Sequence, residues 1–148
     1  MTNSEQQNMD VMHRFFDEVW NKGREEAIDE LYVPEGTAHG LGEKYKSGPE
    51  EFKLFHRLLC QTCSDIHAEM NDIMAAGDRV AIRGTITMKH NATGRDLRIE
   101  GGGFARINDG KIVEAWNGWD FVGVMVQLGA LAEDSLDNAF LTGQAKAR

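Results

Sequence analysis

Apolar residues in the first part of the chain recur at the spacing of an amphipathic helix. This first helix is predicted to end at Asn21-Lys22-Gly23, where Gly23 suits a left-handed cap. A second, shorter helix is predicted over residues 24–32 and a third over about 47–64, where Pro49 suits the first turn. Residues 1–8 are polar and are expected to be frayed. The apolar face of the first helix consists of Met9, Met12, Phe16, Val19 and Trp20.

From residue 65 onward, the pattern changes to alternating apolar and polar positions separated by glycine turns, which is typical of strands. The turn Asn108-Asp109-Gly110-Lys111 has the strongest hairpin signal. Gly101-Gly102-Gly103 permits a bulge and strong curvature in the middle of a strand. Residues 37–40 are predicted to form a short edge strand, and four longer strands are predicted over residues 66–76, 79–90, 97–107 and 112–120.

Three helices followed by a meander of antiparallel strands predict an α+β fold. The length of 148 residues is that of one domain, which we place at residues 9–131. The tail, residues 132–148, is expected to carry a short helix over Leu136, Ala139, Phe140 and Leu141.

The charge and composition of the chain disfavour some classes of binding partner. The net charge of -8 and the pI of about 5.1 disfavour nucleic acid and anionic membranes as partners. The chain has no run of 18 apolar residues and no secretory signal at its N-terminus. We therefore expect a cytoplasmic protein, in which Cys60 and Cys63 would be free thiols.

The last predicted strand combines tryptophan residues with one carboxylate, Asp120, at its end. If the face that carries Trp116 points into a pocket, Trp116 forms a wall and Asp120 lies near the mouth. A carboxylate beside aromatic groups loses hydration, which suits it to take a proton from a carbon flanked by two carbonyls and to return it to an oxygen. Asp120 is equally suited to cap a helix that starts near Phe121, and the sequence leaves both roles open. Strict alternation places five residues on this face: Ile112, Glu114, Trp116, Gly118 and Asp120.

Four segments carry a resemblance to a known family: Gly77-Asp78-Arg79-Val80, residues 108–116, Asp120 and Gln127-Leu128-Gly129. Their order and spacing resemble the SnoaL-like polyketide cyclases, of the nuclear transport factor 2-like superfamily, over about residues 9–131. The resemblance implies a cone-shaped barrel, in which a curved antiparallel sheet packs on three N-terminal helices with a pocket between them. It also implies a homodimer through the outer sheet face. In the cyclases an acid on the last strand closes a ring by an aldol reaction, and the matching residue here is Asp120.

Other polar residues are further candidates for the site. His39 could polarise a carbonyl or shuttle a proton. Arg83 could bind an enolate, or it could pair with Glu100 or Glu114 on a neighbouring strand. The predicted catalytic residues are thus Asp120 and His39, and the predicted substrate-binding residues are Trp116, Arg83, Phe16, Trp20, Glu100 and Phe104.

A metal site is not expected, although His56, Cys60, Cys63 and His67 form a suggestive series. Ligands strung along one straight helix lie too far apart for a single tetrahedral zinc ion. The expected function is therefore that of a cofactor-free cyclase or isomerase acting on an apolar, polyketide-like carbonyl compound. The alternatives are a non-catalytic protein that binds an apolar small molecule and an epoxide hydrolase-like enzyme. The second alternative is weakened because Arg83 is followed by Gly84-Thr85 rather than by a nearby aspartate.

Overall fold

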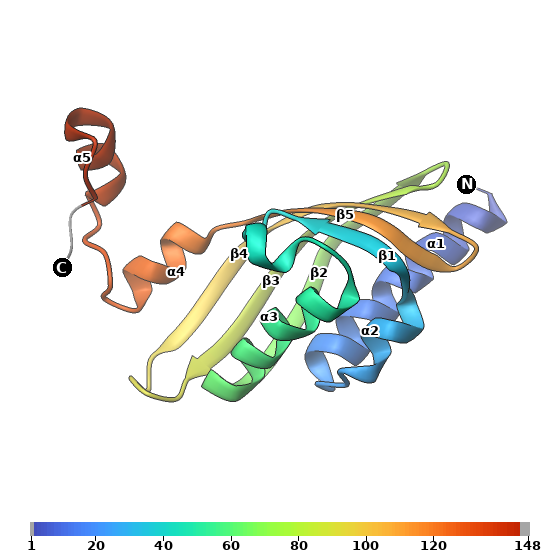
Figure 1. Ribbon diagram of the computed structural model, residues 1–148, viewed down its shortest axis with the longest axis horizontal. Coiled ribbons are helices and arrows are strands. Elements are labelled where there is room, and N and C mark those ends of the chain that lie inside the picture. The colour runs from blue at the N-terminus through green and yellow to red at the C-terminus, as the bar shows by residue number, and fades with distance from the viewer. Residues whose placement is uncertain (1, 146–148) are drawn as a thin grey trace.

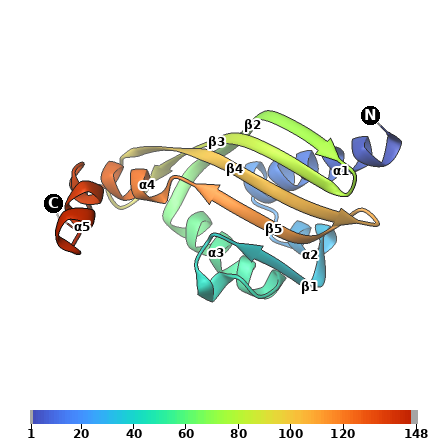
Figure 2. The same cartoon turned by 90° about the horizontal axis from the view of Figure 1, so that it is seen from above.

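A computed structural model describes residues 2–145 as a curved five-stranded sheet with helices on one face (Figures 1 and 2). The fold is α+β, as predicted, but the sheet does not close into a barrel. The elements in chain order are α1 (Asn3–Phe15), the π-helix η1 (Phe16–Asn21), α2 (Glu26–Leu31), β1 (Tyr32–His39), the 3-10 helix η2 (Glu43–Tyr45), α3 (Pro49–Thr62), β2 (Cys63–Ala76), β3 (Arg79–His90), β4 (Asp96–Asn108), β5 (Lys111–Trp119), α4 (Phe121–Gln127) and α5 (Ser135–Thr142).

The first helix begins earlier than its apolar pattern predicted. Thr2 and Glu5 form a capping box, in which each side chain accepts a hydrogen bond from the other residue's backbone N–H. Residues 3–8 are therefore helical rather than frayed, while Met1 lies outside the described residues. At the other end, Asn21 exchanges hydrogen bonds of 3.1 and 2.6 Å with the backbone of Ala68, which fixes the end of η1 against β2.

The sheet has the strand order β1-β5-β4-β3-β2. β2 to β5 form the predicted antiparallel meander, and β1 adds a strand that pairs with β5 in parallel, a direction that was not predicted. The edge strand predicted at residues 37–40 is confirmed and begins earlier, at Tyr32. Pro34 lacks a backbone N–H and is tolerated here because edge strands leave such groups unpaired.

A bulge in the last hairpin decides which side chains face the helices. The pairing of β4 with its neighbours runs without a break through Gly101-Gly102-Gly103, so the bulge is not at the glycines. The register shifts instead between Arg106 and Ile107, where Ile107 pairs with Ile112 and Arg106 pairs with Glu114. Val113 is the extra residue, and every side chain after it lies on the face opposite to the one that strict alternation predicts.

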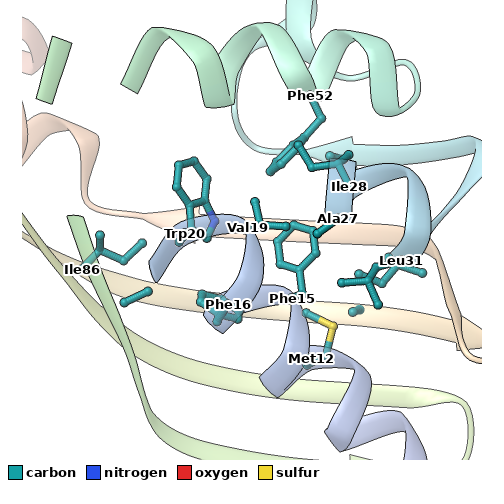
Figure 3. Close-up of a cluster of buried hydrophobic side chains, with 14 of the residues drawn as sticks. Met12, Phe15, Phe16, Val19, Trp20, Ala27, Ile28, Leu31, Phe52 and Ile86 are labelled. Atoms are coloured by element: carbon teal, nitrogen blue, oxygen red, sulfur yellow. The ribbon is translucent and has the colours of Figure 1, made fainter. Parts of the chain in front are cut away.

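The hydrophobic core lies between the inner face of the sheet and the N-terminal helices, and Figure 3 shows part of it. The predicted apolar face of β3 is confirmed by Val80 and Met88, which are buried. Val19, Ala27 and Ile28 are completely buried, and they fill the space where η1, α2 and the sheet meet.

Replacing Ile28 by alanine should remove three buried carbon atoms from this core. We expect the free energy of unfolding to fall by about 2–5 kcal/mol, because the surrounding side chains cannot fully close the cavity. Urea denaturation followed by circular dichroism would measure the change. Leu54→Ala is the matched control, since Leu54 is 51% exposed on α3 and should change the stability much less.

The C-terminal segment leaves the body of the protein. α4 packs beside β4, whereas α5 stands away from the sheet and the N-terminal helices (Figures 1 and 2). The short helix predicted in the tail is confirmed as α5, and residues 146–148 lie outside the described part. None of the helices in residues 2–145 combines the length and the apolar character that a membrane span requires.

Candidate active site

A pocket opens between the inner face of the sheet and helices α1, η1 and α3. The space between its lining residues is about 810 Å³ when open solvent is included, and about 70 Å³ of it can hold the centre of a water molecule. The wall is overwhelmingly apolar, and its aromatic members include Phe16, Trp20, Phe55, Trp119 and Phe121. Figure 3 shows Phe16 and Trp20 on the N-terminal helical segment, where the Trp20 ring packs against Phe55 of α3. The pocket is therefore suited to a flat, mostly apolar molecule.

The inner face of β5 contributes Ala115, Asn117 and Trp119 to this wall. Trp119 packs against Phe16 with ring centroids 6.3 Å apart, and its Nε1 donates to Asn117 Oδ1 at 3.2 Å. Asn117 Nδ2 in turn donates to the backbone oxygen of His39 at 3.0 Å. The amide of Asn117 is thus held in a fixed orientation within an apolar surface.

Tyr32 is a second polar group in the pocket lining. The side chain is almost fully buried, and its hydroxyl donates to the backbone oxygen of Thr37 at 3.4 Å. Burial raises the pKa of Tyr32 well above its usual value, with a smaller contribution from the negative charge of Glu114. The phenol is therefore neutral at physiological pH and can only donate or accept hydrogen bonds.

Asp120 lies between two pocket-lining residues, Trp119 and Phe121, where β5 passes into α4. Its Oδ1 accepts a hydrogen bond of 2.8 Å from Gly123 N, so it caps α4 as one of the two interpretations predicted. Its backbone N–H donates to the backbone oxygen of Glu100 at 3.0 Å. The side chain is exposed rather than enclosed by aromatic groups, and its catalytic role stays a prediction.

Hydrogen bonds of the segment Gln127-Leu128-Gly129 hold the end of α4 against the sheet. The side-chain amide of Gln127 makes two hydrogen bonds of 2.8 Å with the backbone of Arg98, one to its N–H and one to its C=O. The Arg95 guanidinium donates to the backbone oxygen of Gln127 at 2.8 Å, at the negative end of the helix. Gly129 has a φ of +78° close to the same guanidinium, a conformation that favours glycine. This motif therefore holds the helix that Asp120 caps.

Replacing Gln127 by alanine should loosen α4 without unfolding the domain. We expect a loss of about 1–2 kcal/mol from two removed hydrogen bonds, together with faster amide hydrogen exchange at Arg98 and Gly123. Hydrogen exchange measured by NMR would locate the change. Gln61→Ala on α3 is the control, and equal protection of Gly123 in both variants would contradict the anchoring role.

Besides Asp120, five of the predicted site residues do not project into the pocket. Trp116 and Phe104 form a register pair with side chains on the outer face, although their strand segments contribute to the pocket wall. His39 stacks on Trp116 with centroids 5.8 Å apart. Its Nε2 lies 2.8 Å from Glu114 Oε2, and the hydrogen bond lowers the pKa of Glu114. Arg83 and Glu100 are the remaining two, and both are exposed.

The ion pairs of Arg83 and Glu100 differ from those predicted. Arg83 Nε binds Asp72 at 2.6 Å rather than Glu100 or Glu114. Glu100 instead pairs with Arg98 at 3.1 Å. The arginine on which the epoxide hydrolase alternative depends is therefore 66% exposed on the outer face and does not reach the pocket.

Phe16 and Trp20 line the pocket as expected, and Asn117 and Trp119 are among the lining residues that the sequence interpretation missed. Strict alternation placed Asn117 and Trp119 on the outer face, and the bulge at Val113 reverses that assignment. The series of possible zinc ligands is also dispersed. His56 Nε2 lies 2.7 Å from Val19 O within the core, while His67 belongs to β2.

The sequence profile of the SnoaL-like polyketide cyclases matches residues 10–128. The chain belongs to the SnoaL-like polyketide cyclase family. The match spans the pocket and Asp120, and it reaches into the motif that anchors α4. A comparison with curated proteins gave no match.

Solved structures similar to this SnoaL-like chain agree with the fold. TsrD from Streptomyces laurentii is 22% identical with a TM-score of 0.77, and the alignment covers 88% of this chain and 99% of that one. IdmH from Streptomyces antibioticus, a proposed polyketide cyclase, is 28% identical with a TM-score of 0.72, covering 83% of this chain and 99% of that one. AclR from Streptomyces galilaeus, a proposed hydroxylase, is 23% identical with a TM-score of 0.75, covering 86% and 98% of the two chains.

Proposed function

We propose that this SnoaL-like protein is a cofactor-free cyclase that closes a ring in an apolar, polyketide-like carbonyl compound. The observation that carries the proposal is the position of Asp120 between two aromatic residues that line the pocket, Trp119 and Phe121. Asp120 itself is exposed and is not part of the pocket wall, so the proposal requires its carboxylate to turn toward a substrate held against these rings. Family membership favours the same chemistry.

The reaction needs one group that takes and returns a proton. Asp120 removes a proton from the carbon between two carbonyl groups, and the resulting carbanion is delocalised over both oxygens. This carbon attacks a second carbonyl of the same molecule and forms the new carbon–carbon bond. Asp120 then returns the proton to the alkoxide oxygen, so the carboxylate is regenerated without a metal or an oxidant.

The capping hydrogen bond assists this role by fixing the carboxylate. Oδ1 is held by Gly123 N at 2.8 Å, which leaves Oδ2 as the atom that exchanges the proton. Inside the pocket, the second N–H of the Asn117 amide would orient a carbonyl oxygen, because the first N–H donates to His39 O and the Tyr32 hydroxyl donates to Thr37 O. The apolar walls would exclude water from the carbanion once the substrate fills the pocket.

A second function is favoured by the exposure of Asp120 and by its engagement as a helix cap. In that case the pocket holds an apolar metabolite without converting it, and Asp120 serves only α4. The two functions share the ligand class and the pocket, and they differ in whether Asp120 is needed for chemistry.

Ligand binding in the pocket is testable with benzoylacetone, an aromatic β-diketone, because Trp20 and Trp119 report on the site by their fluorescence. Ala115→Phe should fill part of the pocket and weaken binding at least about 10-fold. Ala81→Phe, on the outer face of β3, is the matched control and should leave the affinity unchanged. If both variants weakened the affinity for benzoylacetone equally, or if Ala115→Phe left it unchanged, the ligand would bind outside this pocket.

A further inference from the structure

The outer face of the sheet carries an apolar row that crosses four strands. Met74, Ala81, Phe104 and Trp116 are consecutive register partners, and the row ends at His39 on the edge strand β1. Met74 is 64% exposed and Phe104 is 55% exposed. Side by side on neighbouring strands, these residues form a continuous apolar surface on the face that the helices do not cover (Figure 2).

Charged residues border this row on both sides, and arginines outnumber carboxylates among them. Arg79 and Arg106 occupy the register row on one side, and Arg79 lies over the Trp116 ring at 5.7 Å from its centroid. Arg83 occupies the row on the other side. Two carboxylates offset these three arginines, because Arg106 pairs with Glu114 and Arg83 pairs with Asp72.

Two glycines continue the register row of Arg83 and leave a shallow depression beside the apolar row. Gly102 and Gly118 are register partners next to Phe104 and Trp116, and neither carries a side chain. A methyl group built on Gly118 would meet only Gly102 O, at 3.7 Å. A side chain from another molecule can therefore lie flat against the strands here, beside the apolar row.

The C-terminal arm, residues 121–145, has the complementary character. Five of the nine large hydrophobic side chains exposed in residues 2–145 belong to it: Val122, Met125, Leu136, Phe140 and Leu141. Phe140 is 86% exposed and Leu141 is 84% exposed. The arm contains no lysine or arginine, and its acidic residues include Glu133 and Asp137. On α5, Leu136 and Phe140 are four residues apart on one side of the helix, and Asp137 lies next to Leu136 in the first turn.

We propose that α5 of one copy of this chain docks on the apolar row of a second copy, and that the two copies exchange their arms reciprocally. Phe140 and Leu136 would cover Phe104 and Trp116, while Asp137 would face the arginines beside the row. The inference is independent of the proposed reaction. Of the residues near the pocket it uses only Phe104 and Trp116, whose rings lie on the outer face of the sheet.

A second copy of the chain is a better packing partner for α5 than solvent or the sheet of its own chain. A helix of eight residues is marginal in water without a packing partner, and α5 stands away from its own sheet and N-terminal helices (Figures 1 and 2). Each chain carries one arm and one row, so reciprocal exchange satisfies both surfaces and closes with two-fold symmetry.

Sedimentation velocity of the full chain at micromolar concentration tests the proposal. The wild-type protein should sediment as a dimer, and Phe140→Asp and Phe104→Asp should each raise the dimer dissociation constant at least about 30-fold. Leu54→Asp is the control, because Leu54 is a comparably exposed apolar residue on α3, away from the arm and the row. Circular dichroism of all variants separates a lost contact from a lost fold.

Mixing the two variants distinguishes arm exchange from other dimers. Phe104→Asp retains an intact arm and Phe140→Asp retains an intact row, so the mixture should form a heterodimer with one good contact although each variant alone is monomeric. A monomeric wild-type protein, or a dimer that Phe140→Asp leaves unchanged, would overturn the proposal. So would a mixture that does not associate beyond either variant alone.

Discussion

Asp120→Asn is expected to lower catalysis at least about 100-fold while the protein stays folded. The asparagine side chain retains an oxygen that can accept from Gly123 N, so α4 keeps its cap. It cannot take up and return a proton, so the step proposed for the carboxylate is lost. Exchange of the central methylene protons of benzoylacetone for deuterium, followed by NMR, measures this step above the rate in buffer. It does not require the natural substrate.

The control for this variant is Glu100→Gln. Glu100 is an exposed carboxylate whose backbone oxygen accepts from Asp120 N, so it lies close to the site without lining the pocket. Glu100→Gln should retain the wild-type exchange rate. If Asp120→Asn also retained that rate with an unchanged melting temperature, the protein would be a binding module in which Asp120 only caps α4.

Gly103→Ala is expected to have the largest effect on stability. A methyl group at this position would lie 1.8 Å from the backbone oxygen of Trp116 and 2.9 Å from its carbonyl carbon. Because these are backbone atoms of the paired strand β5, the sheet itself must shift. We expect the free energy of unfolding to fall by about 3 kcal/mol or more, measured by urea denaturation.

Gly118→Ala is the matched control in the same sheet. Its methyl group would meet only Gly102 O, at the ordinary contact distance of 3.7 Å. The stability should change by less than about 1 kcal/mol, and a gain is possible because alanine has less freedom in the unfolded chain. Equal losses in the two variants would mean that the close approach of β4 and β5 at Gly103 is not what makes glycine necessary.

Periodicity predicted most of the elements because each buries one face. The strand Arg79–His90 was predicted with the bounds that the structure has, since its apolar side chains alternate without interruption. The start of α1 was missed because Asn3 to Asn8 contribute no apolar face and are instead held by the Thr2–Glu5 capping box. The parallel pairing of β1 with β5 was missed because a strand's own pattern does not reveal the direction of its neighbour.

The site was harder to predict than the fold because one extra residue changes its composition. The bulge at Val113 turns Asn117 and Trp119 into the pocket and leaves Trp116 on the outer face. Nothing in the local sequence, Ile112-Val113-Glu114, indicates that Val113 is the unpaired residue. Asp120 was identified by its place at the end of the strand, but its predicted position near the mouth came from the same alternation, which the bulge at Val113 reverses.

A crystal structure with benzoylacetone bound tests most directly whether the pocket and Asp120 work together. We predict the phenyl ring against Phe16 and Trp119, with the carbon between the two carbonyls about 3–3.5 Å from a carboxylate oxygen of Asp120. A ligand in the pocket whose acidic carbon points away from Asp120, with the carboxylate bound only to Gly123 N, would contradict the catalytic assignment.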